Sequence, residues 1–198
     1  RPRLERRQAR RVVRDGCAPL LALAPADRDR DDPVVANDAP GGIAVRCSTE
    51  QSQLGEGIRW DARRSELLAV DIVAGRVYRR RVADDGGLSL IRKYQVPGTV
   101  GAIAPIYGDD GWLLAAGLGF VHLSPDGSLR TLVEVTAPGT RMNDAACDPQ
   151  GRFWAGTLAS DFRTGGGALY RLDRNGQTKL VLGELTISML KGKDGFQR

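Results

Sequence analysis

The sequence predicts an all-β fold, and three observations support this. The chain has 25 Gly and 10 Pro among 198 residues, and 41% of its residues are hydrophobic. Short apolar and β-branched runs alternate with turn residues, as in strands joined by hairpins. A pattern also recurs: Gly75, Gly119 and Gly167 are 44 and 48 residues apart, and each precedes a Tyr or His by three positions. A chain of this length can bury a core.

Each repeat is predicted to hold two strands around its glycine and one further β-like run. The expected strands are 66–70, 75–79 and 88–94, then 111–116, 119–123 and 129–135, then 152–156, 167–171 and 177–182. Short strands with a period in the 40s are typical of a β-propeller with one four-stranded blade per repeat. A closed propeller needs roughly four to eight blades. About three are predicted here, which leaves open edges for self-association.

The formal net charge of +5 is concentrated near the N-terminus, where seven arginines lie within the first 14 residues. Residues 1–41, Arg-rich and then Ala/Pro/Asp-rich, are predicted to be a disordered leader, with order beginning near a short strand at 43–47. Nucleic-acid or acidic-membrane binding and a transit peptide are alternatives for this arm. No aromatic residue precedes Trp60, so bases have no stacking platform, and we expect no nucleic-acid partner. No apolar run approaches the ~20 residues that cross a bilayer, and we expect no membrane partner.

The cysteines and the histidine do not form a recognisable catalytic or metal pattern. Cys17, Cys47 and Cys147 are odd in number and widely spaced, unlike a disulfide framework or a zinc site. Cys47 and Cys147 are expected to be buried in strands, and a reducing, cytoplasmic location is predicted. His122 is the only histidine and occupies the place that tyrosines hold in the other repeats. It is therefore expected to pack rather than to act as a base, and the three tryptophans are expected in the core.

Two stretches carry candidate functional side chains. Arg141-Met142-Asn143-Asp144 places a cation, an amide and a carboxylate within four residues, ahead of a turn at 148–151 and a strand at 153–157. Such a group at the start of a packed strand can form a site, although Asn143 and Asp144 could simply cap a turn. Glu56 lies between Gly55 and Gly57. It is either part of a surface turn or a carboxylate that opens an inner strand and faces a hard cation such as calcium or magnesium.

Taken together, these motifs resemble those of the SMP-30/gluconolactonase/luciferin-regenerating-enzyme (regucalcin-like) family. The resemblance covers about residues 43–188, roughly half of a family domain, and rests on the combination of three stretches. These are 54–57 with 60–61 and 70–72, then 141–144 with 148–157, then 167–173.

The resemblance implies a six-bladed propeller that binds one divalent cation in its channel and hydrolyses sugar lactones such as gluconolactone. Residue by residue, Glu56 matches a metal ligand, while Arg141 and Asn143 match substrate-binding residues. Calcium is the first expectation, with zinc, magnesium and manganese as alternatives. The cation would act as a Lewis acid on the lactone carbonyl. A non-catalytic calcium-binding or protein-interaction module is the alternative function.

The chain also departs from the family pattern. Met189 follows Thr186-Ile187-Ser188 where the family usually has a metal-binding Asn, and a thioether is a poor ligand for a hard cation. The later blades, with the expected carboxylate ligand and base, are not found. We therefore predict a partial propeller over 42–188, a non-family tail over 189–198, no retained catalytic residue and impaired activity. A biological truncation and a gene-model error both remain open.

Overall fold

The computed structural model describes residues 46–136 and 138–190, and within these ranges it contains strands and no helix. The all-β prediction is therefore confirmed. The strands are β1 (Gly55–Asp61), β2 (Glu66–Asp71), β3 (Arg76–Val82), β4 (Leu88–Gln95), β5 (Val100–Pro105), β6 (Trp112–Ala116), β7 (Gly119–Leu123), β8 (Leu129–Glu134), β9 (Thr140–Cys147), β10 (Phe153–Ala159), β11 (Gly167–Leu172) and β12 (Thr178–Leu185). The described residues contain no helix that could span a membrane.

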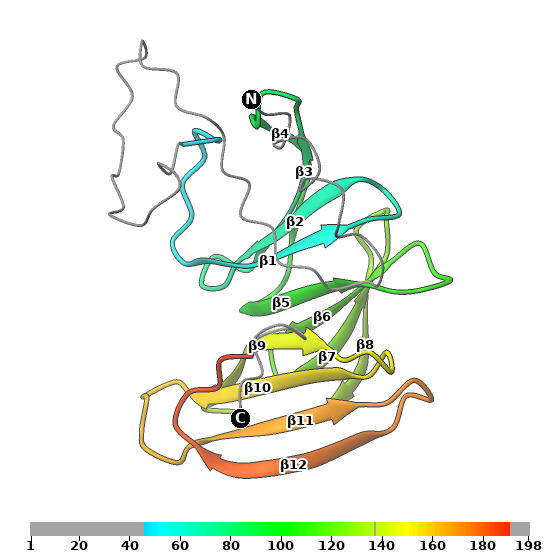
Figure 1. Ribbon diagram of the computed structural model, residues 1–198. Helices are drawn as coiled ribbons and strands as arrows, with labels where there is room; N and C mark the ends of the chain where they lie inside the picture. The colour runs from blue at the N-terminus through cyan, green and yellow to red at the C-terminus, as the bar shows by residue number, and fades with distance from the viewer. Residues whose placement is uncertain (1–45, 137, 191–198) are drawn as a thin grey trace, which may run out of the picture.

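The strands form three four-stranded antiparallel sheets, and each sheet follows the chain order: β1 to β4, β5 to β8 and β9 to β12. We call these sheets 1, 2 and 3. The three predicted repeats thus correspond to three propeller blades. Figure 1 shows that the sheets radiate from β1, β5 and β9, which are neighbours in the middle of the molecule. The first strand of each sheet is therefore the inner strand.

Two apolar layers hold the sheets together. Between sheets 1 and 2 the core includes Leu68, Val70 and Val77 of sheet 1 and Trp112 of sheet 2. The ring of Trp112 is completely buried, and its Nε1–H donates to Asp61 Oδ2 at 3.2 Å. Burial of such a side chain stabilises the fold by roughly 1.5–3 kcal/mol or more.

The second layer lies between sheets 2 and 3. Phe120 of β7 packs edge-on against Phe153 of β10, with ring centroids 5.9 Å apart. Met142 of β9 is fully buried beside them. Met142 points into this layer, and successive side chains of a strand point to opposite faces of the sheet. The polar neighbours of Met142 on β9, Arg141 and Asn143, therefore point away from this layer.

Four details differ from the sequence-based expectations. Arg46 and Cys47 do not lie in a strand, and Cys47 is exposed, although its carbonyl oxygen accepts the N–H of Leu88 on β4 at 2.8 Å; the rest of the expected 43–47 strand is outside the described residues. Cys147 is partly buried. Trp60 and Trp154 are also only partly buried, and of the three tryptophans Trp112 alone lies fully in the core. The predicted leader over 1–41 is likewise outside the described residues.

Candidate functional site

Each of the three inner strands contains a register irregularity. The pairing of β1 with β2 shifts between Glu56 and Arg59, and the pairing of β5 with β6 shifts between Val100 and Ala102. On β9, the shift lies where Asn143 and Asp144 together face Gly156 of β10. A β-bulge re-aims the side chains of the bulged strand. Glu56 and Asn143 therefore lie at register shifts of the inner strands, and Arg141 lies two residues before the shift on β9.

Glycines bring the bulges close together. A Cβ atom on Gly57, which has a φ of +62°, would lie 3.5 Å from the carbonyl oxygen of Gly101. A Cβ atom on Gly101 would lie 1.7 Å from the carbonyl oxygen of Asn143. The backbone of β5 thus contacts both β1 and β9. This contact places the strand of Glu56 and the strand of Asn143 on the two sides of Gly101.

Arg141 and Asn143 form a hydrogen-bonded pair on β9. Arg141 Nη1 donates to Asn143 Oδ1 at 2.9 Å and to the carbonyl oxygen of Met142 at 3.2 Å. Asn143 is 8% exposed, and its Nδ2 donates to the carbonyl oxygen of Ser188 at 2.9 Å. Burial lowers the pKa of the Arg141 guanidinium. Among the described residues, no carboxylate forms an ion pair with Arg141, and of its five N–H donors only those on Nη1 have an acceptor.

Asp144 is the second acceptor in the β9 bulge. Its Oδ1 accepts the N–H of Ala145 at 2.8 Å, and its Oδ2 accepts the N–H of Leu190 at 2.6 Å. Burial raises the pKa of this carboxyl group, although the two amides and the nearby Arg59 oppose the rise. Asn143 and Asp144 together therefore hold the backbone of residues 188–190 against sheet 3.

Arg59 is a site residue that sequence reasoning missed. It lies on β1, is partly buried, and its Nη2 donates to the carbonyl oxygen of Ala145 on β9 at 2.5 Å. Its Nη1 donates to the carbonyl oxygen of Ile58 at 3.1 Å. The available signal was a charged residue inside Ile58-Arg59-Trp60, directly after the bulge glycine. That signal does not reveal a partner that is 86 residues away.

Glu56 lies at the start of β1, opposite Val70 of β2, and is exposed. Within the described part of the chain, no hydrogen bond or ion pair involves its carboxylate. The segment before it is fixed by Asp71, which accepts the N–H of Gln53 at 2.9 Å and that of Leu54 at 3.0 Å. Among the described residues, the Glu56 carboxylate thus has no partner, while the strand that carries it is anchored.

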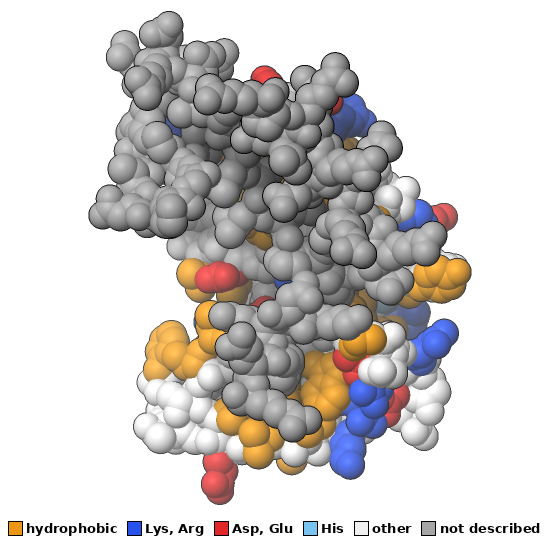
Figure 2. All heavy atoms as spheres, in the orientation of Figure 1, with side chains coloured by type: hydrophobic (Ala, Val, Ile, Leu, Met, Phe, Trp, Pro, Cys, Tyr) orange, Lys and Arg blue, Asp and Glu red, His pale blue; other side chains and the backbone are white. Residues whose placement is uncertain are grey.

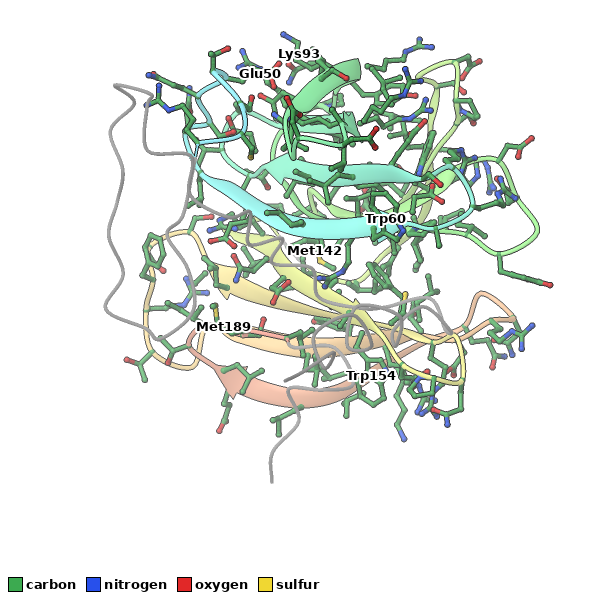
Figure 3. All side chains as sticks on the ribbon, turned by 45° about the horizontal axis from the view of Figure 1, so that its top comes forward. Glu50, Trp60, Lys93, Met142, Trp154 and Met189 are labelled. Carbon is green, nitrogen blue, oxygen red and sulfur yellow. The ribbon has the colours of Figure 1, made fainter. Side chains whose placement is uncertain are left out.

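These residues do not make a complete cation site. No group of three or more His, Cys, Asp or Glu side chains among the described residues could hold a metal ion. Calcium takes six to eight oxygen ligands. Glu56 supplies one free carboxylate, and Asn143 Oδ1 already accepts from Arg141. Met189 is 73% exposed and offers only a thioether (Figure 3). The described residues therefore do not fit a calcium ion by themselves.

His122 lies outside this group. Its Nε2 is 3.1 Å from Asp109 Oδ1, and its Nδ1 is 3.4 Å from Ser124 Oγ. Asp109 also accepts the N–H of Gly111, which precedes β6. The histidine thus connects the loop before β6 with the end of β7.

Residues 54–189 match the family model described as the SMP-30/gluconolactonase/LRE-like region. This match extends over more than half of the chain. The chain belongs to the SMP-30/gluconolactonase/LRE-like family. The resemblance seen in the sequence motifs is therefore confirmed.

Several curated family members are similar to this chain. A 6-deoxy-6-sulfogluconolactonase of Pseudomonas putida is 32% identical over 148 residues, which cover 73% of this chain and 49% of that protein. A pentonolactonase of Haloferax volcanii is 36% identical, covering 69% of this chain and 45% of the relative. A regucalcin of Xenopus laevis is 32% identical, covering 61% and 40%. The chain thus spans about half the length of the curated relatives it matches.

Solved structures of the family have the same fold. The calcium-binding protein regucalcin from Agrobacterium tumefaciens matches with a TM-score of 0.61 and 25% identity, covering 69% of this chain and 45% of that structure. A luciferin-regenerating enzyme matches with a TM-score of 0.60 and 25% identity, covering 67% and 46%. The three sheets of this chain are therefore propeller blades of the SMP-30/gluconolactonase type.

Proposed function

We propose that this chain carries part of the site of a sugar-lactone hydrolase, with Arg141 and Asn143 as its substrate-binding residues. The observation that carries the proposal is the pair itself: a half-buried guanidinium, with no acid partner among the described residues, is bonded to an amide at the bulge of an inner strand. The lactonase names of two relatives support this substrate class. Gluconolactone and pentonolactones are the substrates we would test first.

The proposed reaction needs water to add to the lactone carbonyl. The ring C–O bond then breaks, which gives a hydroxy acid and releases a proton at neutral pH. The free donors of Arg141 would hold a substrate oxygen or the negative charge that develops on the carbonyl oxygen. Asn143 is fixed by Arg141 at one end and by Ser188 at the other, so it would present its remaining N–H and lone pair in one orientation.

A divalent cation, with calcium as the first candidate, would use Glu56 as a ligand and supply Lewis acidity. The calcium-binding description of the similar Agrobacterium protein supports a cation in this family region. Since the described residues offer too few ligands, we derive no step through the cation and propose impaired turnover for this chain. A cytoplasmic location remains a proposal, supported by three widely spaced cysteines in the sequence.

The alternative is a non-catalytic module that binds a partner or a second copy. It is favoured by exposed apolar side chains on the outer strand β12, where Leu180 is 55%, Val181 41% and Leu182 54% exposed. Figure 2 shows hydrophobic side chains gathered over the lower sheet, sheet 3, on the visible face. Such exposed apolar groups are typical of interaction surfaces.

Aldonate formation decides between the two functions. D-glucono-1,5-lactone and a pentonolactone are incubated with the chain and added calcium, zinc, magnesium or manganese, and the acid is quantified above spontaneous hydrolysis. Cation-dependent turnover that falls at least about tenfold in Arg141→Met and Asn143→Ala supports the proposal. Arg130→Met, an exposed arginine on β8, is the matched control. Turnover that is absent, or equal in all variants, contradicts the assigned roles.

A further inference from the structure

Arg59 makes a side-chain connection between the first and third sheets. It begins on β1, three positions after Glu56, and its guanidinium reaches the carbonyl oxygen of Ala145 in the β9 bulge. Both strands also contact Gly101 of β5. Arg59 therefore supplements a backbone contact through sheet 2 with a direct polar contact between the two strands that carry the candidate site residues.

The contact continues from Ala145 into the site. The carbonyl oxygen of Ala145 accepts from Arg59, while its N–H donates to Asp144 Oδ1. Asp144 Oδ2 in turn accepts from Leu190. Asn143, the preceding residue, holds Ser188 through its Nδ2. A continuous series of polar contacts thus runs from β1 through the bulge to residues 188–190.

The partners of Arg59 differ from those of most other buried or partly buried arginines of the described residues. Five of these form ion pairs with carboxylates at distances between 2.5 and 2.8 Å: Arg64, Arg79, Arg80, Arg152 and Arg171. Within the described ranges Arg59 has no ion pair, and the acceptors of its hydrogen bonds are two carbonyl oxygens. Its charge is nevertheless close enough to Asp144 to favour the ionised carboxylate. Arg59 thus acts on the bulge through both a hydrogen bond and a longer-range charge.

We propose that Arg59 is a positioning residue, which holds the β9 bulge in the conformation that presents Arg141 and Asn143 and fastens residues 188–190. The contact itself does not depend on the chain being a hydrolase. Its consequence for a bound lactone rests on the proposed function.

Amide exchange measured by NMR tests the contact without requiring activity. In Arg59→Met, the Leu190 amide is expected to exchange about tenfold faster, because Asp144 loses its nearby positive charge and its fixed neighbour. Arg59→Lys, which keeps the charge, should restore part of the protection. In Arg59→Met/Asp144→Asn, Leu190 should exchange no faster than in Asp144→Asn alone, because both changes act on one series of contacts. Arg130→Met is the control.

Two results would overturn the proposal. One is unchanged Leu190 exchange in Arg59→Met. The other is an equal rise in exchange across sheets 1 and 2 with a matching fall in Tm, which indicates general destabilisation. If wild-type turnover is found, Arg59→Met should also lower kcat/KM while Arg59→Lys restores part of it, and unchanged kinetics would refute the functional role. If turnover is absent, the proposed function fails, and the exchange data still show whether Arg59 holds the β9 bulge.

Discussion

Gly101 of β5 lies against the carbonyl oxygen of Asn143 on β9, so closely that a Cβ atom on Gly101 would be 1.7 Å from that oxygen. Its φ is not in the left-handed region, so the requirement for glycine comes from this contact and not from backbone conformation. The position of Asn143 on β9 relative to β5 therefore depends on the absence of a side chain at Gly101.

Replacing Gly101 with Ala should destabilise the fold by about 1–3 kcal/mol, because the backbones of β5 and β9 must separate. The change in unfolding free energy is measured by urea titration with tryptophan fluorescence. Gly183→Ala is the matched control, since a Cβ atom there has no neighbour within 4 Å and its φ is not positive. Equal stability of the two variants would show that the inner strands are not in contact as described.

Asp71→Asn should lower stability most strongly near neutral pH. Burial opposes ionisation of Asp71, but hydrogen bonds from the amides of Leu54, Gln53 and Ala74 outweigh it and lower the pKa below the ordinary value of 3.8. A carboxyl group whose folded pKa is lowered stabilises the fold above its unfolded pKa, and this contribution is lost as pH falls through the folded pKa. The expected loss is about 1–3 kcal/mol at pH 7.

The measurement is urea unfolding at several pH values between 7 and 3. The difference between wild type and Asp71→Asn should shrink as the pH drops below about 4. Asp84→Asn, an exposed residue in the β3–β4 turn, serves as control. A difference that stays constant with pH would mean that the ionised carboxylate of Asp71 is not what anchors the segment before Glu56.

The repeat predicted nine of the strands, because their apolar runs and turn glycines recur at a regular spacing. The inner strands were harder to recognise. β5 contains Gly101 and ends with Pro105, and β9 carries Arg141, Asn143 and Asp144. Gly, Pro, Asn and Asp are depleted in β-strands. They are tolerated because bulges and close backbone contacts, which need tertiary structure, stabilise these strands.

The candidate site was recognised only in part for the same reason. Arg141 and Asn143 are near in sequence, so their pairing could be anticipated from one motif. The contacts of Asn143 with Ser188, of Asp144 with Leu190 and of Arg59 with Ala145 join residues 45, 46 and 86 positions apart. No local pattern encodes such partners, and they follow from the order of the sheets.

Self-association through sheet 3 should depend on Leu182, which is 54% exposed on β12 opposite Leu169. We expect the wild-type chain to sediment as concentration-dependent oligomers, because apolar side chains are buried on association. Leu182→Asp should shift it toward the monomer. Leu132→Asp, on the outer strand of sheet 2 and 38% exposed, makes the same change elsewhere. A monomeric wild type, or equal effects of both variants, would exclude this surface.

Glu56→Gln should separate a ligand role from a structural one. The carboxylate is exposed and has no partner within the described residues, so its replacement should change stability by no more than about 0.5 kcal/mol, or roughly 1–2 °C in Tm. If Glu56 binds a cation, the same change should abolish calcium binding, because an amide oxygen carries no charge. Isothermal titration calorimetry of both proteins, with Glu134→Gln on β8 as control, measures this. If Glu56→Gln still gives a heat of calcium binding, other residues bind the cation. If the wild type gives no heat of calcium binding, Glu56 does not act as a calcium ligand in this chain.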